Sequence, residues 1–122
     1  MITITNDIRL PLARADEITA LKEAAASLSV YPDVLKVVVF GSRVRGDFTG
    51  DSDMDVLVVI SKMDLKLMND VIHLLGELEF KYDVPISPTI RTKKEYEVNK
   101  NMGSPFITNV EREGITLYDS GS

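Results

Sequence analysis

The sequence predicts an α/β or α+β fold, in which one small mixed β-sheet is flanked by helices. Two continuous apolar runs, Leu35–Phe40 and Met54–Ile60, are typical of buried central strands. Segments with the apolar spacing of helices alternate with these runs along the chain. The 122 residues are 44% hydrophobic and 27% charged, which are ordinary values for a globular chain. A single domain over residues 1–122 is therefore expected.

The first half of the chain predicts a helix that precedes the two strands. From about Leu12 to Leu28 the apolar residues have helical spacing, and the triplet Ala24–Ala26 supports a helix. The segment Tyr31–Asp33 contains a proline and is expected to end this helix before the first apolar run begins. Between the two apolar runs, Ser42–Asp47 is expected to form a short helical turn.

The second half begins with a long helix and a third strand. Asp64 can cap the helix, and its apolar stripe follows the 3.6-residue period at Leu65, Met68, Ile72, Leu75 and Leu78. The third strand is expected at Tyr82–Thr92. Pro85 and Pro88 would remove two ladder donors from this strand, which confines it to an edge of the sheet or splits it.

Three shorter elements follow the third strand. A helix is expected to begin at Thr92 or Lys93 and to run to about Asn101. A second short helix can cover Phe106–Arg112, and a last extended segment is expected at Ile115–Tyr118. The alternation of helices and strands is what a mixed sheet with flanking helices requires.

The most informative stretch lies between the two apolar runs. Gly41 and Ser42 end the first run, ten residues separate Ser42 from Asp53, and Asp53 and Asp55 lead into the second run. Because side chains of a strand alternate between its faces, the two aspartates point the same way, with Cα atoms ~6.5 Å apart. Two such carboxylates repel each other unless a cation lies between them, and hard oxygen ligands suit Mg²⁺. Since a strand-to-helix turn also presents backbone N–H groups to phosphate, the stretch predicts a site for a metal–nucleoside triphosphate.

This stretch resembles the signature of the polymerase-β-type nucleotidyltransferases, in which Gly-Ser is followed by ten residues and Asp-x-Asp. It is most similar to the minimal nucleotidyltransferases (MNT proteins), since Gly41–Gly46 reads Gly-Ser-Arg-Val-Arg-Gly and Ser52–Asp55 reads Ser-Asp-Met-Asp. The alternative without a function is a Gly/Asp-rich surface loop. The two halves of the motif, Gly-Ser and Asp-x-Asp, both lie at strand ends, which argues against this alternative. The resemblance implies a polymerase-β-like fold over the whole domain and a Mg²⁺-dependent enzyme with ATP as its substrate.

A third carboxylate is expected beside Asp53 and Asp55, because two-metal chemistry needs more ligands than two adjacent aspartates supply. The family places this residue at the start of the strand after the long helix, where Asp83 stands in this sequence. The resemblance therefore implies that Asp53, Asp55 and Asp83 hold two Mg²⁺ ions, with Asp83 as a metal ligand or as general base. The alternative is that Asp83 only caps the turn between helix and strand.

Four residues are candidates for nucleotide binding: Gly41, Ser42, Arg45 and Ser52. Ser42 can bond a phosphate oxygen through its hydroxyl and its backbone N–H. Arg45 matches the family arginine three residues after the serine, and its planar guanidinium suits bidentate phosphate contact. Ser52 can offer one more backbone donor, with a plain serine turn as the alternative. His73 falls off the predicted stripe of its helix and is expected at the surface.

Composition narrows the classes of function. The net charge of −5 argues against a nucleic-acid-binding protein, which needs a basic surface. The chain has no cysteine, so a disulfide framework and a thiolate metal site are excluded. No stretch approaches the apolar length of a membrane span, and the N-terminus lacks the basic start of a signal peptide. A cytoplasmic protein that does not bind membranes is expected.

The leading hypothesis is an enzyme that moves AMP from ATP onto a hydroxyl group and releases pyrophosphate. The resemblance implies that the acceptor is a tyrosine of a HEPN toxin, as in HEPN/MNT toxin–antitoxin pairs, and that the chain assembles with this partner. Modification of an antibiotic is disfavoured because the chain lacks an added helical domain, and length and charge disfavour polymerase activity. The alternative from another class is a non-catalytic antitoxin that neutralises its partner by contact.

Overall fold

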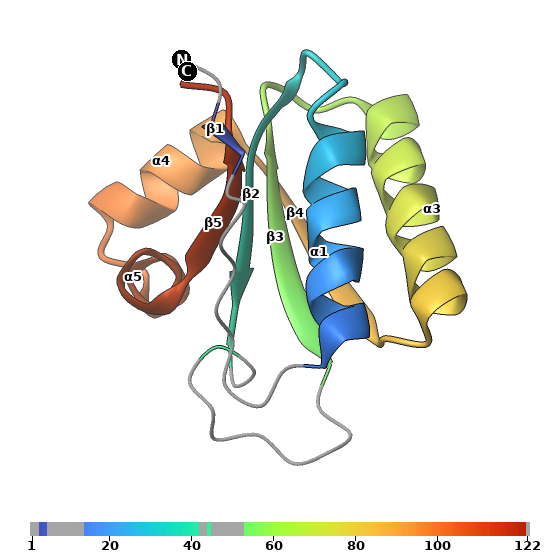
Figure 1. The fold of residues 1–122 in the computed structure, drawn as a ribbon. Helices are drawn as coiled ribbons and strands as arrows, with labels where there is room; N and C mark the ends of the chain where they lie inside the picture. The colour runs from blue at the N-terminus through green and yellow to red at the C-terminus, as the bar shows by residue number, and fades with distance from the viewer. Residues whose placement is uncertain (1–2, 5–13, 42–43, 45–52, 122) are drawn as a thin grey trace.

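A computed structural model describes residues 3–4, 14–41, 44 and 53–121 of the chain. Its strands are β1 (Thr3–Ile4), β2 (Val34–Phe40), β3 (Met54–Ile60), β4 (Ile86–Thr92) and β5 (Ile115–Asp119). Its helices are α1 (Ala15–Leu28), α3 (Leu65–Tyr82), α4 (Lys93–Asn101) and α5 (Pro105–Glu113), as Figure 1 shows. Within these described ranges no helix is long and apolar enough to cross a membrane.

The strands form one sheet in the order β1-β5-β2-β3-β4. The interior strand β3 pairs antiparallel with β2 and parallel with β4. The strand β5 pairs antiparallel with both β2 and β1. The predicted mixed sheet flanked by helices is therefore confirmed, and Met54–Ile60 has the predicted bounds.

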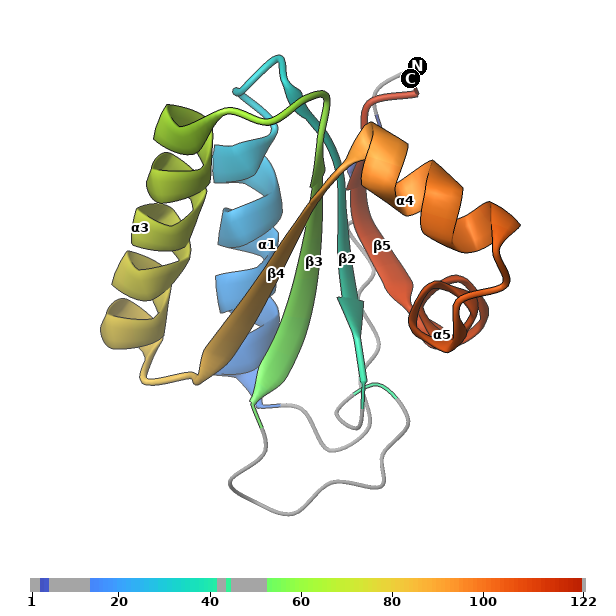
Figure 2. The same ribbon diagram turned by 180° about the vertical axis from the view of Figure 1, so that it is seen from behind.

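Each face of the sheet is covered by a pair of helices, as Figures 1 and 2 show from opposite sides. On one face α1 and α3 pack on the larger core, to which β3 contributes Met54, Val56, Val58 and Ile60. On the other face α4 and α5 pack on a smaller core that contains Leu57 and Val59 of the same strand. Because side chains alternate along a strand, Asp55 lies on the face of Leu57 and Val59. The α4/α5 face therefore carries the predicted site.

The long helix runs further than the sequence suggests. The strand expected at Tyr82–Thr92 begins only at Ile86, because α3 continues to Tyr82 and ends at Asp83. Tyr82 is half-buried against the larger core, one turn after Leu78, so packing favours helix at this position. The predicted edge position is confirmed for Pro88, which lies in the edge strand β4, whereas Pro85 precedes this strand and takes no ladder donor from it.

The buried side of α3 also differs from the predicted stripe. The structure buries Leu67, Val71, Leu75 and Leu78. Leu65 and Ile72 of the predicted stripe are 72% and 49% exposed. Both sets have helical spacing, and only the contacts of α3 with α1 and β4 decide which set faces the core. The predicted cap is confirmed, since Asp64 Oδ1 accepts a hydrogen bond of 3.1 Å from the backbone N–H of Leu67.

Other predicted elements lie close to their expected bounds. The first helix is confirmed from Ala15 to Leu28, and the start predicted at Leu12 lies outside the described residues. Of the predicted turn Ser42–Asp47 only Val44 is described, and its backbone N–H donates to the carbonyl of Gly41 at 3.1 Å. The two short helices and the last strand are confirmed with shifts of one residue or less.

Polar contacts tie α4 to α5 and so hold the helices of the α4/α5 face. The Tyr96 hydroxyl donates to Glu111 Oε2 at 3.0 Å, and Lys100 Nζ lies 3.1 Å from the same oxygen. Burial, together with the bond to Glu111, raises the pKa of Tyr96 to about 12, so this phenol stays protonated. The ion pair with Lys100 lowers the pKa of Glu111.

The start of α4 is set by a reciprocal cap. Thr92 Oγ1 accepts from the Glu95 backbone N–H at 3.1 Å, and Glu95 Oε1 accepts from the Thr92 backbone N–H at 2.9 Å. These bonds from Thr92 lower the pKa of Glu95. Thr92 is also the last residue of β4, so the cap joins the sheet edge to the helix.

Removal of this cap should destabilise the fold by an amount typical of helix caps. Thr92→Ala loses the acceptor at the helix start, and we expect unfolding to require about 1 kcal/mol less than in the wild type. Thr92→Ser keeps the hydroxyl and serves as the control, with a much smaller loss. Urea unfolding measures both values, and equal losses in the two variants would contradict the capping role.

Candidate functional site

The predicted metal residues lie at one end of the sheet, where β2 ends and β3 and β4 begin (Figures 1 and 2). Asp53 directly precedes β3 and is exposed, and Asp55 is the second residue of β3 and is half-buried. Met54, between them, is fully buried in the larger core. The alternation of the strand therefore turns both aspartates toward the α4/α5 face, as the sequence predicts.

Gly41 and Asp55 are in direct contact at this end of the sheet. Phe40 is the register partner of Asp55, so Gly41 follows β2 at the level of the carboxylate. The backbone of Gly41 has φ +89°, a region that side chains of L-residues rarely adopt, and a Cβ there would overlap Asp55 Oδ2. The glycine thus allows the carboxylate to lie against the backbone of the next strand.

The other predicted nucleotide-binding residues fall in the stretch between β2 and β3. Ser42, Arg45 and Ser52 lie outside the described residues. Their predicted roles therefore rest on the motif and on the position of its two ends, Gly41 and Asp53, which the structure describes.

Asp83 is not on a strand beside the other two aspartates. It ends α3 in the left-handed conformation, with φ 54° and ψ 48°, and its side chain is exposed. Asp is one of the residues that accept this conformation, so the capping alternative describes its backbone. In the described part of the chain no three acidic, histidine or cysteine side chains lie close enough together to hold a metal ion. The structure thus brings Asp53 and Asp55 to one face and leaves Asp83 at the neighbouring helix end.

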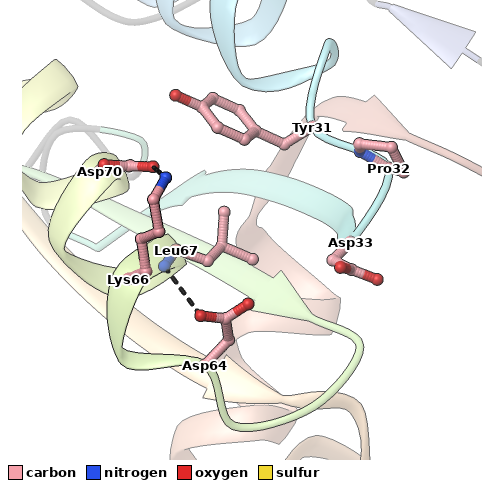
Figure 3. Close-up of a pocket in the computed structure, with 7 residues that line it drawn as sticks. All are labelled: Tyr31, Pro32, Asp33, Asp64, Lys66, Leu67 and Asp70. Atoms are coloured by element: carbon pink, nitrogen blue, oxygen red, sulfur yellow. Dashed lines mark hydrogen bonds and ion pairs between the residues drawn. The ribbon is translucent and has the colours of Figure 1, made fainter.

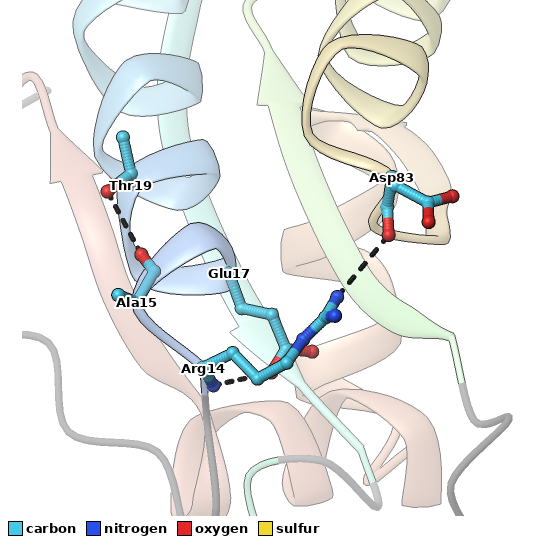
Figure 4. Close-up of polar contacts among 5 residues, drawn as sticks. All are labelled: Arg14, Ala15, Glu17, Thr19 and Asp83. Carbon is cyan, nitrogen blue, oxygen red and sulfur yellow. Dashed lines mark hydrogen bonds and ion pairs between the residues drawn. The ribbon is translucent and has the colours of Figure 1, made fainter.

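Arg14 links the start of α1 to the end of α3 (Figure 4). Its Nη2 donates to the backbone carbonyl of Asp83 at 3.4 Å, where the helix dipole favours a cation. Its backbone N–H donates to Glu17 Oε1 at 2.7 Å, and Glu17 is buried, with 3% of its surface exposed. The bond from Nη2 connects Asp83 to the start of α1, and the bond to Glu17 lies within that helix start.

Strand pairing places two residues of β4 on the same face of the sheet as Asp55. The parallel register places Ser87 opposite Asp55 and Arg91 opposite Val59, so both side chains belong to the α4/α5 face. The guanidinium of Arg91 lies 6.0 Å from the ring centre of Phe106 in α5. Neither residue is among those predicted from the sequence, although the period-two pattern Ser87, Thr89, Arg91 was a signal that could have indicated them.

A hollow of about 130 Å³ lies next to Gly41 and is lined by Phe40, Gly41, Phe106, Asn109 and Glu113. The rings of Phe40 and Phe106 meet edge to face, with centroids 5.3 Å apart. The hollow has an apolar wall and two polar side chains from α5. The face that carries Asp55 therefore combines carboxylates, a hydroxyl, a guanidinium and an aromatic surface.

Comparison with known proteins identifies the class of the domain. Residues 18–110 match the model of a family described as nucleotidyltransferase domain. A protein of Methanocaldococcus jannaschii named "putative protein adenylyltransferase" is 35% identical over 103 residues, which cover 82% of this chain and 97% of the relative. A second protein of that organism with the same name is 36% identical over 105 residues, which cover 84% and 99%.

Solved structures agree with the fold. A chain of a toxin–antitoxin structure with AMP-PNP superposes with a TM-score of 0.54 at 16% identity, covering 82% of this chain and 74% of that one. A chain of a mutant MntA–HpeT toxin–antitoxin structure gives a TM-score of 0.51 at 13% identity, with the same coverage. At these identities the likeness concerns the fold alone.

Gly41 and Gly76 provide a matched test of the contact with Asp55. Gly41→Ala forces a Cβ onto the Asp55 carboxylate at a positive φ, and we expect a loss of stability of about 1–3 kcal/mol. Gly76→Ala places a Cβ in open space on α3, and we expect a gain of about 0.5–1 kcal/mol. Thermal unfolding compares the two, and a neutral Gly41→Ala would contradict the close approach of strand and carboxylate.

Proposed function

This chain belongs to the nucleotidyltransferase family, and we propose that it moves AMP from ATP onto a hydroxyl group of a partner protein. The observation that carries the proposal is the pair Asp53 and Asp55 on one face at the start of β3, with Gly41 against the Asp55 carboxylate. Support for adenylyl transfer comes from the names of the two relatives and from the motif that connects Gly41 to Asp55.

The residues present fit a magnesium ion. Two carboxylates at one strand end, without cysteine or histidine beside them, form the hard oxygen donor set that Mg²⁺ prefers. We assign Asp53 and Asp55 as its protein ligands, and Ser87 offers a hydroxyl on the same face. When bound, Mg²⁺ would neutralise negative charge on the triphosphate and on these carboxylates. The resemblance to the minimal nucleotidyltransferases implies two Mg²⁺ ions, and we propose that number here.

The proposed reaction is a displacement at the α-phosphorus of ATP. The acceptor oxygen forms a new bond to this phosphorus, and the bond from phosphorus to the oxygen that bridges to the β-phosphate breaks. Pyrophosphate leaves with the electron pair of the broken bond, and the acceptor loses its proton. Ser42, Arg45 and Ser52, together with the backbone of Gly41, are the groups we assign to the phosphates.

The proton of the acceptor needs a base. A tyrosine hydroxyl has an ordinary pKa near 10 and is a weak nucleophile at neutral pH. Asp83 is the proposed general base or third metal ligand, and its support is its exposed position at the same end of the sheet as Asp53. An acceptor on a second protein can reach this end, because Asp53 and Asp83 are both exposed.

We propose a HEPN toxin as the acceptor, with one of its tyrosines adenylylated, and an assembly of the two proteins. The MNT-type motif Gly41–Asp55 supports this partner, and chains of toxin–antitoxin structures share the fold. The acidic net charge of −5 is in keeping with a protein acceptor rather than a nucleic acid. A cytoplasmic location follows from the same proposal.

The enzymatic function is tested on the mass of the partner. After co-expression with a HEPN-type toxin, the wild type should add one or more AMP groups to the toxin. Asp55→Asn should abolish the addition, and EDTA should do so in the purified pair, because the metal clamp is lost. Asp119→Asn, at the far end of β5, is the matched control and should transfer normally. An Asp55→Asn protein that still protects cells without any change in toxin mass would assign neutralisation to contact alone.

The role of Asp83 is tested by Asp83→Asn. Asn accepts the left-handed conformation at this position, so the thermal stability should stay unchanged. A general base or metal ligand is lost in this variant, and we expect transfer to fall by at least about 100-fold. Transfer at the wild-type rate would leave Asp83 with its capping role only, without affecting the assignment of Asp53 and Asp55.

A further inference from the structure

Helix α3 has apolar side chains on its outer side as well as on the side that packs against the core. Its inner side buries Leu67, Val71, Leu75 and Leu78, while Leu65, Ile72 and Phe80 on its outer side are 72%, 49% and 91% exposed. With Gly76, these three residues follow the spacing i, i+7, i+11 and i+15 and form one band, here called the outer stripe. Aligned exposed apolar residues of this kind mark an interaction surface.

The outer stripe contains a hollow suited to the side chain of another protein. The hollow, of about 390 Å³, is lined by Ile72, His73, Gly76, Glu77 and Phe80. Gly76 makes its floor, since nothing lies within 4 Å of where a Cβ would stand. Ile72 and Phe80 stand one helical turn before and after this gap, which is the ridge-and-groove relief that a second helix packs against.

A second hollow extends this surface along α3 toward the turn before β2. It is lined by Tyr31, Asn69, Asp70, His73, Leu74 and Glu77, so it shares His73 and Glu77 with the first. A third hollow adjoins it, in which Figure 3 shows Tyr31 facing Asp70 and Lys66, with Asp33 and Asp64 near the other end. Each hollow shares two lining residues with the next, and the three together are here called the furrow.

The charge of this furrow identifies the chemistry of its occupant. Four carboxylates line it, from Asp33, Asp64, Asp70 and Glu77, against the single cation of Lys66. Lys66 pairs with Asp70 at 3.3 Å, and the described part of the chain gives Glu77 no ion pair. Two copies of this chain would bring like charges together along the furrow, which disfavours self-association.

We propose that the outer stripe and its furrow bind an amphipathic helix of a partner protein, with apolar residues against Ile72, Gly76 and Phe80 and lysine or arginine along the acidic edge. This mode is helix-in-groove recognition. The stripe lies on the α1/α3 side of the sheet and Asp55 on the α4/α5 side, so a bound helix leaves the face of Asp55 open. The inference does not depend on the proposed function, because it requires neither metal nor nucleotide.

The test uses two synthetic helical peptides of the length of α3, 18 residues. Both have leucines along one face, and the flanking positions are lysine in one peptide and glutamate in the other. Fluorescence anisotropy should show binding of the lysine peptide to the full chain, at least about tenfold tighter than binding of the glutamate peptide. No binding of either peptide, or equal binding of both, would overturn the proposal.

Variants locate the bound peptide on the protein. Phe80→Ser should weaken binding of the lysine peptide by about tenfold or more, because it removes the most exposed anchor of the stripe. Met102→Ser, which removes a 77% exposed apolar side chain elsewhere, is the matched control and should bind as the wild type does. Glu77→Lys reverses one charge of the acidic edge, so it should weaken binding of the lysine peptide and strengthen binding of the glutamate peptide.

Two further readouts keep the result unambiguous. Thermal unfolding of Phe80→Ser should match the wild type, since the side chain lies outside the core. Sedimentation should show that the wild type does not form a dimer through the outer stripe, that is, a dimer lost in Phe80→Ser. Such a dimer would assign the stripe to a second copy of the chain and overturn the proposal of a partner helix. Unchanged binding of the lysine peptide by Phe80→Ser would also overturn this proposal.

Discussion

The site depends on the contact between the Asp55 carboxylate and the backbone of Gly41. Antiparallel pairing sets Asp55 beside Phe40, and Gly41, the next residue along the chain, lies against the Asp55 carboxylate. Only a residue without a Cβ fits there, both because of the carboxylate and because of the positive φ. One glycine therefore allows two strand ends to converge on the volume where metal and phosphate are proposed to bind.

One face of the sheet supplies most of the hydrophobic core, and the other face carries the candidate site residues. The larger core with α1 and α3 contains the inward residues of β2 and β3 and supplies most of the burial. The smaller core with α4 and α5 covers only part of the other face, and Asp55, Ser87 and Arg91 lie on that face. Asp55 belongs to the same strand as the buried Val56 and Val58, so the packing of the core helps to fix its backbone.

Partner binding and chemistry can occupy separate surfaces on such a fold. The acceptor that we propose would reach the strand ends near Asp53, whereas the outer stripe of α3 lies over the opposite face. A partner held by α3 would be kept close to this end of the sheet, which would raise its effective concentration there without blocking the proposed nucleotide site. The end of α3 at Asp83, tied to Arg14, is the point where the two surfaces come nearest along the chain.

Local patterns in the sequence determined much of this protein. The period of two in a strand already placed Asp53 and Asp55 on one face, the Gly41–Asp55 motif indicated the family, and Pro88 indicated an edge strand. Only the tertiary structure decided that Ser87 stands opposite Asp55, that Asp83 ends a helix, and which apolar residues of α3 face the core. The register of a strand and the side of a helix that faces the core depend on contacts with segments distant in the sequence. A local pattern that fits two registers or two helix faces therefore cannot choose between them.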